Sequence, residues 1–168
     1  RQVNNNLYTN YLARWNLKYV LSLLEVMKKE ETSSYNELVE KTGLTEMETA
    51  KWKEVQEKIY LPRKEGTKLL EQFEGYFELD NVTIEKYDEN DWPIRPEALK
   101  TKKAKETQIN KQADVVMLLH LMGNEFDDET IKENYAYYEK RTLHGSSLSP
   151  SIYSCLLYTS PSPRDPKT

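Results

Sequence analysis

The chain has 168 residues, a formal net charge of −4, 38% hydrophobic residues and 31% charged residues, which fits one domain or part of a larger one. Its longest strongly apolar run, residues 115–122, is less than half the roughly 20 residues that a membrane-spanning helix needs. The 24 Lys and Arg are interleaved with 28 Asp and Glu, which leaves no basic stripe for a phosphate backbone. We therefore expect no membrane and no nucleic acid as a partner.

The chain has too few cysteines and histidines for an internal disulfide or a Cys/His zinc site. The single Cys155 cannot form an internal disulfide, and two histidines do not complete a zinc site of the Cys/His type. We expect no metal in the site. A reducing compartment suits such a chain, so a cytoplasmic location is predicted.

The two ends of the sequence look unlike the ends of a natural protein. Arg1 leads directly into a polar segment with no charged-then-apolar leader, so we expect the sequence to begin inside a longer protein. Residues 155–165 read Cys-Leu-Leu-Tyr-Thr-Ser-Pro-Ser-Pro-Arg-Asp, which is the translation of a common transposase sequencing adapter. The alternative is a natural Pro/Ser-rich tail. We interpret residues 155–168 as a non-native, adapter-derived tail and residues 1–154 as the native stretch.

The N-terminal third predicts three helices. Apolar residues recur at three- and four-residue steps up to residue 27, which predicts one long helix that ends near Glu30. We expect its apolar stripe to be core; the stripe comprises Leu12, Trp15, Tyr19, Leu23 and Met27. Two Ser/Thr-x-x-Glu capping boxes, starting at Ser34 and Thr45, predict the beginnings of two more helices. Gly43 is expected to stop the first of these.

Residues 61–96 carry Pro, Gly, Asp and Asn punctuation, which predicts a long ordered connection with one short strand. Long ordered loops in compact domains are often functional. Its aromatic side chains should pack the connection down onto the domain. They are Phe73, Tyr76, Phe77, Tyr87 and Trp92.

The C-terminal part predicts three further helices. Residues 106–122 form the strongest pattern, closed by Gly123, and the second half of this helix is apolar all round, as in a buried inner helix. Acidic residues favour a helix start, so residues 127–138 are predicted to be helical. Ser149 followed by Pro150 predicts an N-cap and first turn of another helix, with helical sequence ending at Ser154. The predicted fold class is all-α, built from consecutive helix pairs.

The segment Arg-Thr-Leu-His-Gly-Ser-Ser-Leu-Ser-Pro, residues 141–150, is a candidate anion site. A loop of hydroxyls and a glycine that runs into a helix can direct free amides and the positive end of the helix dipole at one anion. The residues concerned are His144, Gly145, Ser146, Ser147 and Ser149. The alternative is that the hydroxyls only cap the helix, and spacing alone favours this alternative.

Two other groups of polar residues have a structural and a functional interpretation. Lys111 and Gln112 stand one helical turn before the apolar residues 115–119. Lys111 therefore either faces a cavity or extends to the surface, and the pattern alone favours the surface. The acidic residues around Asp127 resemble a catalytic carboxylate pair, but helix capping explains them.

Four motifs resemble those of one known enzyme family. Residues 3–17, 71–77, 111–116 and 141–151 occur in the same order and at similar spacing in glycoside hydrolase family 65. This family contains inverting disaccharide phosphorylases that act on maltose, trehalose, kojibiose or nigerose. The resemblance covers the whole native stretch.

The resemblance implies a fold and a reaction. Residues 1–154 would be the later half of an (α/α)6 barrel, the catalytic domain of a larger multidomain enzyme. Family members cleave an α-glucosidic bond with inorganic phosphate and release β-glucose 1-phosphate and the acceptor sugar, without a metal or an organic cofactor. Members are commonly homodimers, so a homodimeric parent enzyme is an open expectation.

The resemblance also implies site residues. Lys111 and Gln112 match the pair that binds the transferred glucose, and residues 144–149 match the phosphate-binding loop. The family's general acid is a Glu in a Gly-Pro-Asp-Glu motif, which we expect to lie upstream of Arg1. Loss of general acid catalysis typically costs ~10²–10⁴-fold in rate. The chain as written is therefore predicted to be inactive, with no catalytic residue of its own.

Two alternatives remain open at this point. A family hydrolase, similar to a trehalase, would need a general-base carboxylate where the phosphate loop lies, and residues 141–154 contain no Asp or Glu. A non-catalytic helical interaction module could use the same scaffold. The motifs do not specify which disaccharide is cleaved.

Overall fold

The computed structural model describes residues 2–145 and 148–159, and these fall into two compact units. Residues 9–61 form one unit, and residues 2–8 together with residues from 62 onward form the other. Within the described residues there are α-helices, short 3₁₀ turns and isolated β-bridges but no β-strand, so the predicted helical class is confirmed. No helix in this described part is long and apolar enough to cross a membrane.

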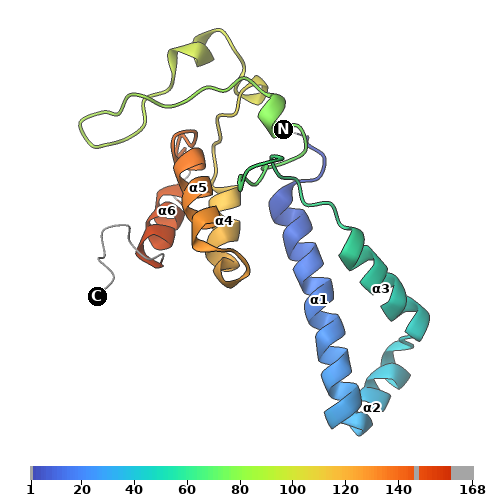
Figure 1. Cartoon of the computed structure of the whole chain (residues 1–168). Helices are drawn as coiled ribbons and strands as arrows, with labels where there is room; N and C mark the ends of the chain where they lie inside the picture. Colours follow the sequence, from blue (N-terminus) through green and yellow to red (C-terminus); the bar gives the residue numbers. More distant parts are fainter. Residues whose placement is uncertain (1, 146–147, 160–168) are drawn as a thin grey trace. The chain divides into compact units, whose positions relative to one another are not determined.

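The unit of residues 9–61 contains three consecutive helices (Figure 1). They are α1 (Leu7–Glu30), whose first two residues belong to the other unit, α2 (Thr32–Thr42) and α3 (Glu46–Lys58). Helix α1 ends where the sequence predicts. Gly43 ends α2 in the left-handed region, with φ of 69°, and its N–H donates to the carbonyl of Val39 at 2.8 Å, as expected for a C-terminal glycine.

One of the two predicted capping boxes is present. The N–H of Glu48 donates to Thr45 Oγ1 at 3.2 Å, and the N–H of Thr45 donates to Glu48 Oε2 at 3.0 Å. The box predicted at Ser34 is wrong, because α2 begins two residues earlier at Thr32. There Thr32 Oγ1 donates to the carbonyl of Lys28 in the last turn of α1, so the chain passes from one helix to the next with almost no loop.

The apolar stripe of α1 is only partly covered within its unit. All residues from 9 to 61 are described, and none of them is buried. Tyr19 and Leu23 of the stripe are exposed by 52% and 44%. The prediction that this stripe is core is therefore wrong for the unit itself, because three consecutive helices are too few to cover both sides of α1.

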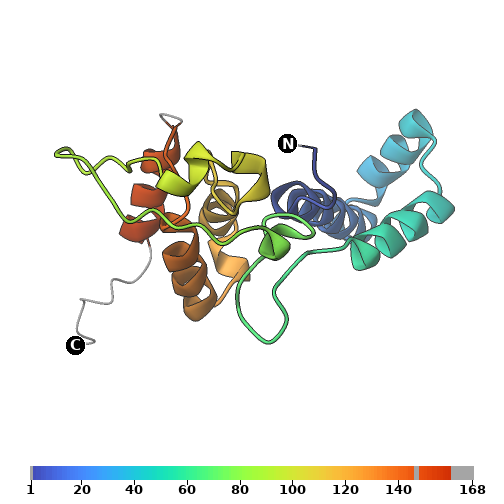
Figure 2. The same ribbon diagram turned by 90° about the horizontal axis from the view of Figure 1, so that it is seen from above.

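The second unit contains three short helices that supply part of its core. They are α4 (Asp114–Leu121), α5 (Asp128–Glu139) and α6 (Leu148–Thr159). Helix α4 contacts both α5 and α6 (Figures 1 and 2). Val116, Leu118 and Leu119 of α4 are completely buried, as predicted for an inner helix.

Helix bounds differ from the predictions at α4 and α6. The predicted helix over 106–122 is an eight-residue helix preceded by a 3₁₀ turn (Ala104–Glu106) and an extended segment. The N–H of Gln108 donates to the carbonyl of Asp80, and the N–H of Asn110 donates to that of Arg141. Because these donors pair with distant segments, residues 108–110 cannot form helical hydrogen bonds.

Helix α6 begins one residue before the predicted N-cap and runs to Thr159. Ser149 is therefore the second residue of the helix and not its cap. The prediction that helical structure ends at Ser154 is wrong, because Leu156 is 3% exposed and extends the apolar face of α6. The adapter origin of residues 155–168 stays a prediction, and residues 160–168 lie outside the described residues.

The connection over residues 61–96 is held down by only some of its aromatic residues. Phe73 and Tyr76 are buried, whereas Tyr87 and Trp92 are 43% and 49% exposed. The predicted short strand is absent from this fully described segment, where isolated bridges join Arg63 to Leu70 and Tyr87 to Pro93. The loop that the Tyr87–Pro93 bridge closes extends away from α4, α5 and α6 in Figure 1.

Candidate functional site

Lys111 and Gln112 lie in the extended segment that leads into α4, not on a helix as the sequence pattern predicts. Both side chains are exposed. Because the segment is not helical, the predicted spacing of one helical turn between these residues and the apolar residues 115–119 does not apply. Each of them lines a cavity of the second unit instead.

A parallel bridge brings the two candidate motifs together. The N–H of Asn110 donates to the carbonyl of Arg141 at 2.7 Å, and the N–H of Leu143 donates to the carbonyl of Asn110 at 2.9 Å. Lys111 and His144 therefore follow directly after paired backbone segments. Gly145 comes so close to Lys111 that a Cβ built on it would lie 3.5 Å from Lys111 Cγ. A Cβ at this distance would make ordinary van der Waals contact with the lysine stem.

Buried hydrogen bonds fix the segment that carries Lys111. Tyr76 is completely buried, and its hydroxyl donates to the carbonyl of Gln108 at 2.6 Å and accepts from Asn110 Nδ2 at 3.1 Å. Burial raises the pKa of Tyr76 far above its ordinary value, so the hydroxyl remains a donor. Gln108 Nε2 in turn donates to the carbonyls of Phe77 and Leu79. The backbone before Lys111 is thereby preorganised.

Arg141, at the start of the candidate anion loop, is engaged elsewhere. Its guanidinium donates twice to Asn81 Oδ1, at 2.7 and 3.1 Å, and once to the carbonyl of Tyr137 at 2.7 Å. The guanidinium also stacks on the Tyr137 ring, 3.7 Å from its centroid. Arg141 is 7% exposed. This arginine supports the loop and is not free to bind an anion.

His144 sits at the turn of the loop. Its φ of 48° lies in the left-handed region, and its Nδ1 is 3.2 Å from Ser149 Oγ. The edge of its ring packs against Tyr153. Burial lowers the pKa of His144, against the opposing attraction of Glu139, so a neutral imidazole is favoured. Ser149 is 3% exposed, while Ser146 and Ser147 lie outside the described residues.

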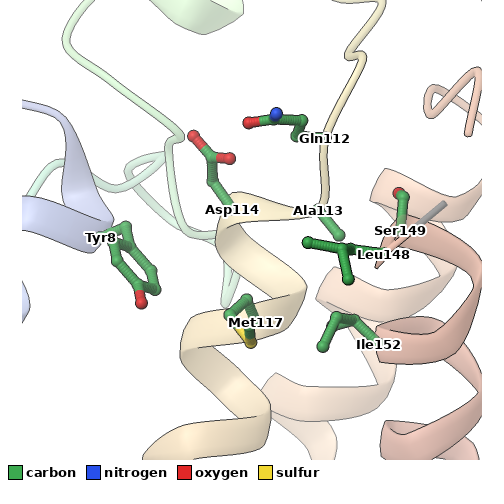
Figure 3. A pocket seen from close by; sticks show the side chains of 8 residues that line it. All are labelled: Tyr8, Gln112, Ala113, Asp114, Met117, Leu148, Ser149 and Ile152. Carbon is green, nitrogen blue, oxygen red and sulfur yellow. The ribbon is translucent and has the colours of Figure 1, made fainter. Parts of the chain in front are cut away.

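Two cavities adjoin these residues and share one wall. A larger cavity of about 560 Å³ is lined in part by Asn110 and Lys111, and a smaller one of about 210 Å³ is lined in part by Met117 and Ser149. Gln112 and Asp114 line both cavities. Figure 3 shows the smaller cavity, with the Asp114 and Gln112 side chains at the amino end of α4.

Sequence reasoning missed Asp114 and Gln72 as site residues. Gln72 Nε2 donates to Asp114 Oδ2 at 3.3 Å, and both residues line the larger cavity. An acidic residue in the first turn of a helix is normally explained by the helix dipole. The two residues are also 42 positions apart, so no local pattern indicates the contact.

The described residues contain no group of three or more His, Cys, Asp or Glu side chains that could hold a metal ion. The site residues offer amides, hydroxyls, the ammonium groups of Lys105 and Lys111, the Asp114 carboxylate and the nearby His144 imidazole. Such groups bind polyhydroxylated ligands and anions by hydrogen bonds.

Comparison with known proteins gives a consistent family match. Residues 1–162 match the central catalytic domain of glycosyl hydrolase family 65. A kojibiose phosphorylase from Caldanaerobacter subterraneus subsp. tengcongensis is 53% identical over 154 residues, which cover 92% of this chain and 20% of that protein. An alpha,alpha-trehalose phosphorylase from Thermoanaerobacter brockii is 34% identical, with the same coverage.

A solved structure agrees with these sequence matches. A putative kojibiose phosphorylase from human microbiome superposes with a TM-score of 0.71 at 32% identity, covering 92% of this chain and 21% of that chain. The chain thus spans about a fifth of the length of the relatives it matches.

Proposed function

Because the chain belongs to the central catalytic domain of glycosyl hydrolase family 65, we propose that it forms part of an inverting disaccharide phosphorylase. The enzyme would transfer glucose from an α-linked disaccharide to inorganic phosphate and release β-glucose 1-phosphate and the acceptor sugar. In this proposal α1 to α6 are helices of an (α/α)6 barrel whose other helices lie outside this segment. The phosphate is a co-substrate, and no cofactor takes part.

Kojibiose is the disaccharide we propose first. Relatives described as kojibiose phosphorylases are 53%, 52% and 39% identical to this chain. The trehalose and maltose phosphorylases compared with it are 34% and 31% identical. The acceptor sugar released with β-glucose 1-phosphate is then glucose.

The observation that carries the proposal is the bridge between Asn110 and residues 141–143. This bridge pairs the residue directly before Lys111 with the residues directly before His144, which supports the proposal that the glucose contacts, Lys111 and Gln112, adjoin a phosphate loop starting at His144. Inverting transfer needs the incoming oxygen and the leaving oxygen on opposite faces of the sugar. A sugar held at Lys111 and Gln112 would then have the loop on one face, from which phosphate attacks.

Phosphate recognition in this proposal does not use an arginine. Arg141 is occupied by Asn81 and Tyr137, so the loop would bind phosphate through backbone amides and hydroxyls. His144 Nδ1 lies 3.2 Å from Ser149 Oγ, and a neutral imidazole can donate one hydrogen bond. Phosphate is itself a competent nucleophile, so no general base is needed.

The test is a hybrid phosphorylase. Residues 1–154 of this chain replace the matching 154 residues of the Caldanaerobacter kojibiose phosphorylase, which supplies the rest of the enzyme and the expected general acid. We expect β-glucose 1-phosphate to form from kojibiose only when phosphate is present. A folded hybrid that forms no β-glucose 1-phosphate would contradict the proposal.

A family hydrolase is the second candidate, because one carboxylate, Asp114, lines both cavities. A hydrolase would use such a group to activate water. The same assay separates the two functions, since a hydrolase releases glucose from kojibiose without phosphate. The isolated 168-residue chain is proposed to be inactive in both reactions, since none of its residues is proposed as the general acid.

A further inference from the structure

Asp114 is a carboxylate in the wall of the site to which the proposed reaction gives no role. It is the first residue of α4 and lines both cavities. Figure 3 shows its carboxylate next to the Gln112 carboxamide, both above the apolar side chains of Met117 and Ile152. Asp114 therefore stands where the polar and apolar parts of the site meet.

Gln72 is the hydrogen-bond partner of the Asp114 carboxylate. Its Nε2 donates to Asp114 Oδ2 at 3.3 Å, and its own carbonyl accepts from the N–H of Leu7 at 3.0 Å and from Asn6 Nδ2 at 3.4 Å. The direction of the carboxamide is fixed, because the reversed orientation would bring two oxygen atoms together. Gln72 is thus anchored through its backbone and aims one donor at Asp114.

This arrangement leaves a buried acceptor without a partner. Gln72 Oε1 is inaccessible to solvent and has no hydrogen-bond partner among the residues that the structure describes. A buried, unpaired acceptor lowers folding stability, and such groups need an explanation other than stability. A role for Gln72 in holding the Asp114 carboxylate towards the cavity is such an explanation.

The negative charge of Asp114 determines whether a sugar hydroxyl or a phosphate can bind next to it. A carboxylate only accepts hydrogen bonds, and sugar hydroxyls donate them. A phosphate dianion next to Asp114 would be repelled. Lys111 and Gln112 line the same cavity as Asp114. One sugar hydroxyl could therefore donate a hydrogen bond to Asp114 while a neighbouring sugar hydroxyl accepts one from Lys111 or Gln112.

We propose that Asp114 is a further sugar-binding residue that accepts a hydrogen bond from a hydroxyl of the transferred glucose, and that Gln72 is the positioning residue that orients it. This inference rests on the proposed function. It adds a negatively charged acceptor to a site otherwise described by a lysine and amides, and it assigns the Asp114 end of the larger cavity to sugar and not to phosphate.

The test uses Asp114→Asn in the hybrid phosphorylase, with Asp128→Asn as the matched control. Asp128 is the first residue of α5 and is exposed, so the control removes the same first-turn charge away from both cavities. We expect Asp114→Asn to lower kcat/KM for kojibiose by about 10- to 100-fold, as for a lost hydrogen bond to a charged group. The KM for phosphate and all constants of Asp128→Asn should stay within about twofold.

Deoxy analogues of the sugar show which hydroxyl donates a hydrogen bond to Asp114. In the reverse reaction, the penalty of Asp114→Asn should disappear for the one β-glucose 1-phosphate analogue that lacks the contacted hydroxyl. A penalty that is the same for every deoxy analogue would overturn the assignment. So would a rise in the KM for phosphate, or kinetics of Asp114→Asn equal to those of Asp128→Asn.

Gln72→Met tests the positioning role separately. Methionine keeps the length of the side chain but removes both the donor and the unpaired oxygen. We expect kcat/KM for kojibiose to fall several-fold while the unfolding temperature stays equal or rises. A lower unfolding temperature with unchanged kinetics would show that Gln72 is only structural. An unmodified hybrid without activity would instead contradict the proposed function, and this inference with it.

Discussion

We predict that the hydrogen bonds of the Tyr76 hydroxyl fix the backbone before Lys111 and so keep Lys111 beside His144. Tyr76→Phe preserves the shape of a completely buried ring and removes one bond donated to the carbonyl of Gln108 and one accepted from Asn110 Nδ2. Each such bond contributes a net 0.5–1.5 kcal/mol, and the groups left behind are buried. We therefore expect local stability to fall by about 2 kcal/mol, or about 30-fold in the opening equilibrium.

Hydrogen exchange of the hybrid phosphorylase measures this directly. The amides of Asn110 and Leu143, which close the bridge between the two motifs, should exchange about 30-fold faster in Tyr76→Phe, because exchange reports local opening. Tyr60→Phe is the control, since that side chain is 50% exposed. Unchanged exchange at both amides would refute the view that Tyr76 holds the site together.

Three further predictions concern the site residues. Lys111→Ala should lower turnover of the hybrid with every acceptor sugar, because Lys111 is proposed to contact the transferred glucose; a loss confined to one disaccharide would contradict that role. His144→Ala should raise the KM for phosphate more than that for kojibiose, and an unchanged phosphate KM would exclude His144 from the phosphate loop. Burial lowers the pKa of His144 below 6.5, against the opposing effect of Glu139, so below that pH the unfolded chain binds more protons than the folded one. The free energy of unfolding should therefore decrease as pH falls from about 6.5, and urea titrations should find this decrease smaller in His144→Gln.

Short sequence motifs correctly predicted the helix ends that are fixed by interactions between neighbouring residues. The end of α1 at Glu30, the glycine stop at Gly43, the capping box at Thr45 and the helix that begins after Asp127 are all present. In each case the hydrogen bonds or dipole interactions lie within one or two turns of the residue concerned. These contacts are encoded by residue type and spacing, so a pattern can find them.

Hydrogen bonds between segments far apart in the sequence explain the features that the sequence pattern did not predict. Residues 107–113 have a helical pattern, but their backbone pairs with Asp80 and with residues 141–143. That pairing moves the start of α4 and makes Lys111 a cavity residue. The Asp114–Gln72 contact depends on the same kind of long-range meeting. The resemblance to a family indicated which motifs matter, whereas their proximity required the structure.

The central claim is phosphate-dependent transfer of glucose at a site built partly from this chain. The most direct measurement is the product formed from kojibiose by the hybrid phosphorylase, with and without inorganic phosphate. The account predicts β-glucose 1-phosphate in the presence of phosphate and no glucose release without it. Phosphate-independent release of glucose would indicate a hydrolase, and a folded hybrid with neither product would contradict the catalytic account.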